Sequence, residues 1–116
     1  MPKPLGPYSQ AVRAGDFLFV AGRAGLHPAT GQTVEGGFEA EARQAYENLR
    51  AVLLAAGSGL EHVVKTTTFI ASPEDVAASG RLYAEYFPID PPARSTPIVG
   101  LPRGLLFSIE AIAVVP

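Results

Sequence analysis

Apolar residues recur along the chain with a helical period in two segments, and these segments predict two helices. Residues 39–56 carry the clearest pattern, with one apolar face made of Ala42, Ala45, Tyr46, Leu49, Val52, Leu53 and Ala56. Gly57 follows directly and is placed to end that helix. The second helix is predicted to begin at Ser72, whose hydroxyl can cap it, and to run to about Phe87, where Pro88 stops it.

Runs of apolar and β-branched residues predict strands before, between and after these helices. Residues 10–13 and 17–21 are expected to form a hairpin, and residues 63–71 a buried strand. Two further strands are predicted at about residues 93–99 and 105–115. The order β-β-α-β-α-β-β predicts an α+β fold in which a single mixed β-sheet carries both helices packed on one face.

The last of these strands is apolar on both of its sides. One side carries Phe107, Ile109, Ala111 and Ala113, and the other carries Ile112 and Val114. A strand that is buried on both faces needs cover beyond the two helices. Hydrophobic residues make up 47% of the chain and charged residues only 17%, which is little charge for the surface of a monomer. The sequence therefore predicts self-association through the helix-free face of the sheet.

Length and charge narrow the class of protein. The 116 residues are expected to form one domain, residues 1–116. The net charge is −2 and the nine Lys and Arg residues do not cluster, which argues against a nucleic-acid-binding surface. No apolar run is long enough to span a bilayer, and residues 1–7 lack the apolar core of a secretion signal. We therefore expect a cytoplasmic protein with no membrane partner.

Few residues of this chain are candidates for binding a metal or for acting as a covalent nucleophile. It has no cysteine, which excludes disulfides, thiol nucleophiles and cysteine-ligated metals. Its two histidines, His27 and His62, have no carboxylates at ligand spacing, so no bound metal is expected. Lys65 lies within a predicted strand, where a Schiff-base role is conceivable but an interface lysine or one reaching to solvent is favoured.

Two charged residues in the C-terminal strands are the candidates for a catalytic or binding role. Arg94 follows a pair of prolines, and Glu110 is the lone carboxylate of an apolar strand. Pro102 lies midway between them in a turn over residues 100–104, so a symmetric antiparallel hairpin would place the two charges opposite each other. A charge in such a strand is costly unless it is paired or used. The pair is therefore either a simple ion pair, or a substrate clamp and a water-orienting acid.

Short motifs along nearly the whole chain resemble the YjgF/YER057c/UK114 family, also called the reactive intermediate deaminase (Rid) family. The matching stretches are Gly6-Pro7-Tyr8-Ser9-Gln10, Phe19-Val20-Ala21-Gly22, Ala42-Arg43-Gln44-Ala45 with Asn48-Leu49, Val64-Lys65-Thr66-Thr67, Tyr83 with Phe87, Pro92-Ala93-Arg94-Ser95, Leu101-Pro102 and Ile109-Glu110-Ala111-Ile112-Ala113. Each stretch alone is weak, and their order and spacing together are specific.

The resemblance implies a chorismate-mutase-like α+β fold that assembles as a homotrimer, with sites in clefts between subunits. It implies hydrolytic deamination of reactive 2-imino acids, which tautomerise with enamines, to 2-keto acids and ammonia, without metal or cofactor. Arg94 would grip the substrate carboxylate and Glu110 would orient or deprotonate the water. Tyr8 would close the cleft, and Gly22 would let its backbone approach the ligand. Tyr8 is equally well explained as a packing anchor. Without the resemblance a structural role, such as an ion pair with Glu110, is favoured for Arg94, whereas the resemblance favours the substrate role. For Glu110 the alternative of tying the strands together through Arg94 stays open.

A second reading is a non-enzymatic trimer that binds small carboxylic acids such as 2-keto acids, or acts as a regulator or chaperone. Arg94 would serve either function, whereas Glu110 favours the enzyme because a pure carboxylate binder gains nothing from a nearby anion. A ribonuclease is the reading least favoured, given the acidic balance and the absence of a basic stripe.

Four positions depart from the commonest pattern of the family. Ala21 stands where a serine is usual, Arg23 where glutamine is frequent, Gly80 where asparagine is usual, and Thr96 where cysteine is usual. Because the Arg, Glu, Tyr and Gly of the motif are kept, the resemblance still implies imine hydrolysis. The substitutions predict a shifted substrate preference.

Overall fold

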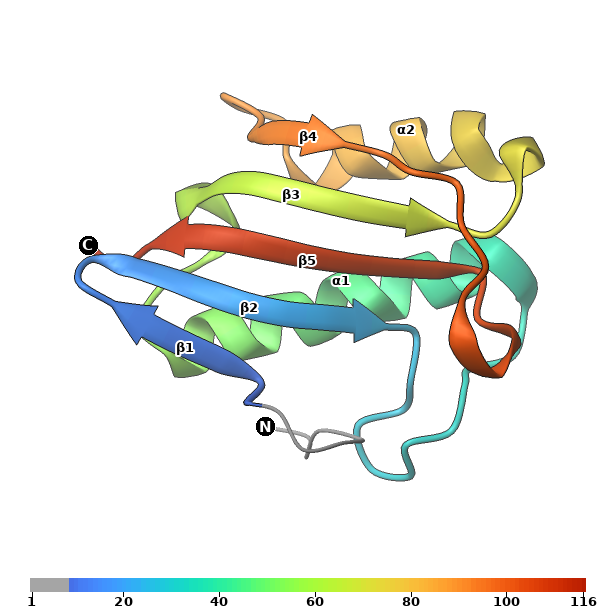
Figure 1. Ribbon diagram of the computed structural model, residues 1–116, viewed down its shortest axis with the longest axis horizontal. Coiled ribbons are helices and arrows are strands. Elements are labelled where there is room, and N and C mark those ends of the chain that lie inside the picture. Colours follow the sequence, from blue (N-terminus) through green and yellow to red (C-terminus); the bar gives the residue numbers. More distant parts are fainter. Residues whose placement is uncertain (1–8) are drawn as a thin grey trace.

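Five strands form one sheet in the order β1-β2-β5-β3-β4 in the computed structural model, which describes residues 9–116 (Figure 1). The strands are β1 (Ala11–Ala14), β2 (Phe17–Ala24), β3 (Val63–Ile70), β4 (Ala93–Ser95) and β5 (Phe107–Val114). Neighbouring strands are antiparallel except β3 and β4, which are parallel. The expected α+β fold with a mixed sheet is confirmed.

Both helices cover the same face of this sheet, as the sequence pattern predicted (Figure 1). Helix α1 spans Gly37–Ala55 and α2 spans Val76–Tyr86. Gly57 lies just beyond α1 with φ +82°, a conformation that favours glycine and ends the helix. The Ser72 hydroxyl accepts a hydrogen bond of 3.3 Å from the backbone N–H of Glu74 and caps the short 3-10 turn that leads into α2.

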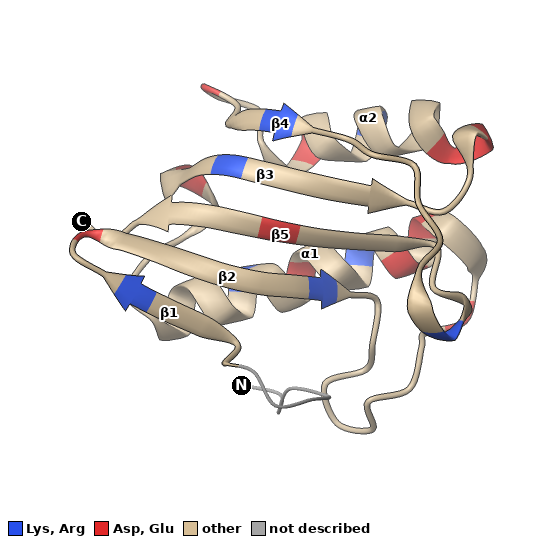
Figure 2. Ribbon diagram, in the orientation of Figure 1, with Lys and Arg blue, Asp and Glu red and all other residues tan. Residues whose placement is uncertain are grey.

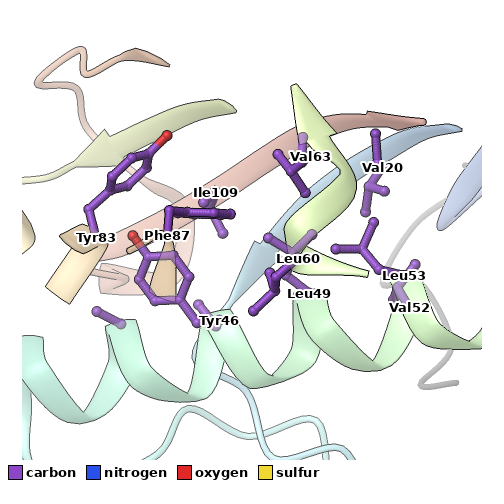
Figure 3. Close-up of a cluster of buried hydrophobic side chains, with 14 of the residues drawn as sticks. Val20, Tyr46, Leu49, Val52, Leu53, Leu60, Val63, Tyr83, Phe87 and Ile109 are labelled. Carbon is purple, nitrogen blue, oxygen red and sulfur yellow. The ribbon is translucent and has the colours of Figure 1, made fainter. Parts of the chain in front are cut away.

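The core lies between the helices and the sheet. Tyr46 and Leu49 of α1 and Phe107 and Ile109 of β5 are fully buried there, and Figure 3 shows Tyr46 and Leu49 of α1 together with Ile109. The rings of Tyr46 and Phe107 lie 5.5 Å apart between centroids. This packing of aromatic and branched side chains removes a large apolar area from water and fixes the helices on the strands.

The expected hairpin between the last two strands is wrong, because β3 lies between β4 and β5. After β4 the chain continues beside the end of β3, where Ile98 forms a bridge with Ile70, before it turns into β5. The β-branched residues of β3 suit a central position with a neighbour on each side. The prolines around β4 lack a backbone N–H, which suits a short strand at the sheet edge.

The face of the sheet opposite the helices exposes large apolar side chains. Val12 is 53% exposed, Phe17 47%, Phe19 46% and Val64 44%. On β5 the four residues predicted for one side, Phe107, Ile109, Ala111 and Ala113, are buried against the helices, while Ile112 and Val114 are half-buried. Exposed apolar surface of this kind is typical of an interaction face. Within residues 9–116, no helix is long and apolar enough to cross a membrane.

Candidate functional site

Arg94 lies on the edge strand β4, and its side chain lies on the helix-covered side of the sheet. Its register partner on β3 is Thr66, which is completely buried beneath α2. The guanidinium carbon Cζ stands 4.5 Å from the centroid of the Tyr83 ring, on α2. A guanidinium over an aromatic face at this distance makes a cation–π contact. Among residues 9–116, no carboxylate lies within ion-pair distance of Arg94.

Tyr83 is itself fixed by a hydrogen bond to the same strand. Its hydroxyl lies 2.6 Å from the Thr66 hydroxyl, and both side chains are buried. Burial raises the pKa of the Tyr83 phenol, while the Thr66 hydrogen bond and the Arg94 charge act in the opposite direction. The phenol is therefore neutral at pH 7 and presents an uncharged ring to Arg94.

A hollow of about 570 Å³ opens beside the Arg94 guanidinium. It is lined by Gly80, Tyr83, Ala84, Phe87, Pro88, Pro91, Pro92 and Arg94. A Cβ atom built at Gly80 would meet no other atom within 4 Å, so the missing side chain leaves open space at this wall. Apart from the one cation, the side chains that line the hollow are apolar or aromatic, and this combination suits a small carboxylate ligand.

Glu110 lies on the other side of the sheet. It is exposed on β5, and its register partner on β3 is Thr67. A second hollow, of about 470 Å³, is lined by Ser9, Val12, Phe19, Val20, Ala21, Lys65, Thr67, Glu110, Ala111 and Ile112. Among the described residues, Glu110 forms no ion pair or hydrogen bond that holds its carboxylate. Its oxygens are therefore available to a water molecule or a ligand on this face.

Lys65 is the cation of this second hollow. Its Nζ donates hydrogen bonds to the Thr66 carbonyl at 2.9 Å and to the Thr67 hydroxyl at 3.2 Å. These bonds hold the ammonium against its own strand, which is the arrangement of a bound structural lysine rather than of a free amine nucleophile. The strands β3, β4 and β5 carry one charged residue each, Lys65, Arg94 and Glu110, while most other charges lie on helices and loops (Figure 2).

Arg94 and Glu110 are therefore not brought together within one chain. Arg94 is level with Thr66 and Glu110 is level with Thr67, and successive residues of a strand point to opposite faces of the sheet. The ion pair that a hairpin would have formed is absent from the described residues, because β3 separates the two strands. One chain thus carries two separate hollows, which we call the Arg94 hollow and the Glu110 hollow.

The remaining motif positions have different surroundings. Gly22 lies where the pairing of β2 with β5 shifts register, and a Cβ there would come within 3.1 Å of the Ser108 hydroxyl oxygen. Ala21 lines the Glu110 hollow. The Thr96 hydroxyl accepts a hydrogen bond of 3.1 Å from the Thr68 hydroxyl. Tyr8 lies outside the described residues.

Arg23, the fourth departure from the usual pattern, is buried at the same irregular segment of β2. Its Nε donates to the Ala21 carbonyl at 3.2 Å, and its Nη1 donates to Gln10 Oε1 at 3.3 Å. These bonds tie β2 to the start of β1 beside the Glu110 hollow. Within residues 9–116, no group of three or more His, Asp or Glu side chains is arranged to hold a metal ion.

Sequence reasoning named Tyr83 only as part of a family motif and missed its contact with Arg94. A contact between a helix and a strand edge has no periodic signal, because it depends on how the helix is placed on the sheet. The spacing of Gly80 and Tyr83, three residues apart on one helix, was the available sign that they share a face.

Comparison with known proteins identifies the family. The family model described as Endoribonuclease L-PSP matches residues 1–115. A RutC family protein of Pyrococcus horikoshii is 46% identical over 97% of this chain and 90% of its own length. The mouse protein named 2-iminobutanoate/2-iminopropanoate deaminase is 44% identical over 97% of this chain and 84% of its own length. The chain belongs to the Endoribonuclease L-PSP family, which is the YjgF/YER057c/UK114 family that its motifs resemble.

Solved structures support the same assignment. The crystal structure of RidA from an Antarctic Psychrobacter superimposes with a TM-score of 0.93 at 35% identity, covering 97% of this chain and 92% of that one. Escherichia coli TdcF, solved with bound serine, gives a TM-score of 0.90 at 34% identity. The match covers 97% of this chain and 91% of the TdcF chain. The fold is thus that of the Rid proteins, and the names of several relatives support a deaminase in general terms.

Proposed function

We propose that this protein hydrolyses 2-imino acids to 2-keto acids and ammonia, as a 2-iminobutanoate/2-iminopropanoate deaminase type of enzyme. The observation that carries the proposal is the Arg94 guanidinium, which faces an open apolar hollow without an acidic partner among the described residues. The mammalian relatives named for this activity add independent support.

The chemistry needs a carboxylate anchor and an oriented water. Arg94 binds the substrate carboxylate through two parallel N–H donors, which fixes the neighbouring imine carbon in space. Glu110 accepts a proton from a water molecule while the oxygen of that water bonds to the imine carbon. The imine nitrogen gains a proton in the same step. In the resulting carbinolamine the hydroxyl proton is transferred to the amino nitrogen as the C–N bond breaks and ammonia leaves, so C=N and water become C=O and NH₃ without a redox step.

The geometry of one chain supports placing the reaction in clefts between subunits of a homotrimer. The Arg94 hollow and the Glu110 hollow open on opposite faces of the sheet, so both can flank one substrate only if they come from two copies. The exposed Phe17 and Phe19 beside the Glu110 hollow supply an apolar surface for that contact. In this arrangement Arg94 of one subunit and Glu110 of the next share each cleft.

A second candidate function is binding of small carboxylic acids without turnover. The unpaired Arg94 favours it equally, and the structure of TdcF contains bound serine, which carries a carboxylate. The two functions differ at Glu110, which only hydrolysis requires. Nucleic-acid cleavage, which the name of the family model suggests, gains little support from a net charge of −2.

The proposed activity is tested by competition for a short-lived imine. An amino-acid oxidase generates 2-iminopropanoate or 2-iminobutanoate in the presence of semicarbazide, which traps the imine as it forms. An active protein lowers the yield of trapped imine and raises the rate of ammonia release. If the wild-type protein leaves both unchanged while 2-oxobutanoate still binds, the carboxylate-binding function replaces the enzyme.

A further inference from the structure

We propose that Tyr83 is a positioning residue that sets the plane of the Arg94 guanidinium for carboxylate binding. The assignment of a carboxylate ligand rests on the proposed function, whereas the contact itself is a feature of the chain. The Arg94 Cζ lies 4.5 Å from the Tyr83 ring centroid, and the contact joins helix α2 to the edge strand β4.

The Tyr83 ring is a rigid support. Its hydroxyl is bound to Thr66 at 2.6 Å, and its ring contacts Phe87, with the ring centroids 4.7 Å apart and the ring planes tilted by 46°. Figure 3 shows Tyr83 and Phe87 side by side above the Tyr46 ring. Thr66 is also the register partner of Arg94. The residue that binds the Tyr83 hydroxyl is therefore paired directly with Arg94 across the two strands. Ring and arginine are therefore placed by the same local structure.

A free arginine side chain on an exposed edge strand samples many rotamers, and ordering it on ligand binding costs entropy. Stacking over a ring uses one face of the guanidinium and leaves the N–H groups in its plane unoccupied. These in-plane donors are the ones that bind a carboxylate in a bidentate manner. Tyr83 therefore orders Arg94 before the ligand arrives without competing for its donors.

Gly80 completes this arrangement one helical turn earlier. It lines the same hollow, and no atom lies within 4 Å of the position its Cβ would take. The helix surface next to the ring is therefore open, so the ligand can reach the edge of the guanidinium that Tyr83 does not cover.

The contact is measured directly by NMR on the assembled protein. The Nε–Hε resonance of Arg94, assigned by its loss in Arg94→Lys, should be shifted upfield by the Tyr83 ring current in the wild type. Tyr83→Phe should keep that shift because the ring stays, and Tyr83→Leu should abolish it. Tyr86→Leu is the matched control. Tyr86 is on the same helix, but its ring lies under Arg50 instead of Arg94, with the Arg50 Cζ 5.6 Å from the Tyr86 ring centroid.

The functional consequence is measured by binding and kinetics. Tyr83→Leu should weaken 2-oxobutanoate binding, and raise KM for the imine, by about 3- to 30-fold, which is the range of one cation–π contact. kcat should change less, and Tyr83→Phe should restore KM. If the wild type does not hydrolyse imines, the proposed function fails, while the resonance shift still tests the contact with Arg94.

Three outcomes would overturn the inference. An Arg94 resonance without an upfield shift in the wild type would show that the ring does not hold the guanidinium, and this result needs no variant to fold. A folded Tyr83→Leu protein with wild-type resonance position, binding and KM would show that the ring has no positioning role. A rise in KM for Tyr86→Leu equal to that for Tyr83→Leu would likewise count against it.

Discussion

Arg94 and Glu110 project from opposite faces of one sheet, level with Thr66 and Thr67 of the strand that separates them. Neither charge neutralises the other, and each lines its own hollow. This relationship excludes a complete Arg–Glu site within residues 9–116 of a single chain. It is the structural basis for our proposal of a site shared between subunits.

Arg94→Ala should abolish imine hydrolysis while the assembly persists. Arg94 is exposed on β4 and supports no ion pair among the described residues, so its loss costs little folding energy. Loss of a charged anchor should cost about 2–5 kcal/mol of transition-state binding, or roughly 30- to 5,000-fold in kcat/KM. Arg94→Lys should recover little, because an ammonium cannot make the bidentate contact. Normal turnover by a folded Arg94→Ala protein would refute the role.

Phe19→Asp should dissociate the assembly. Phe19 is 46% exposed on the helix-free face next to the Glu110 hollow, so a buried carboxylate there would lack a partner. We expect sedimentation equilibrium to find a trimer for the wild type and a monomer for Phe19→Asp, with imine hydrolysis lost in parallel. Leu54→Asp is the control, since Leu54 is 61% exposed on α1, on the other side of the molecule. A monomeric wild type would contradict the proposed assembly.

Gly80→Asn should change substrate preference and leave activity intact. Gly80 lines the Arg94 hollow with open space at its Cβ, so an asparagine fits there and narrows the site. We expect the wild type to favour bulkier imines and Gly80→Asn to shift toward the small ones, by about 10- to 200-fold at most for a change of this size. Relative rate constants for a series of imines of increasing side-chain length provide the measurement. An unchanged profile would show that this wall does not select substrates.

Thr66→Val should destabilise the fold. The substitution keeps the shape of the side chain but leaves the buried Tyr83 hydroxyl without its partner at 2.6 Å. An unsatisfied buried hydroxyl costs about 1–3 kcal/mol, so thermal unfolding should occur several degrees lower. The double variant Thr66→Val with Tyr83→Phe removes both hydroxyls and should recover much of the loss. Additive losses in the double variant would show that the bond contributes little.

The sequence predicted those parts of the fold that depend on local patterns. Helix α1 followed from its apolar spacing, and the start of the α2 region followed from the Ser72 cap. Strand pairing could not be predicted in the same way, because the symmetric spacing of Arg94 and Glu110 about Pro102 does not reveal that β3 is inserted between them. That insertion separates the two charges, and their register with Thr66 and Thr67 places them on opposite faces.

The candidate site was likewise predictable by residue type but not by arrangement. Arg94 and Glu110 stood out as charges in apolar strands, and the family motif drew attention to Gly22. The stacking of Arg94 on Tyr83 depends on how α2 packs over β3 and β4, which is set by tertiary contacts. The placement of Arg94 and Glu110 in two separate hollows therefore could not be read from the residue pattern.

In the proposed assembly, each cleft uses Arg94 from one subunit and Glu110 from its neighbour. Arg94→Ala and Glu110→Gln chains with different tags can be coexpressed, and assemblies that carry both tags isolated. In any mixed trimer with cyclic symmetry, about one cleft in three then combines an intact Arg94 with an intact Glu110. We predict that both parent variants are inactive and that mixed trimers regain about one third of wild-type activity. Mixed trimers as inactive as their parents would contradict the shared site.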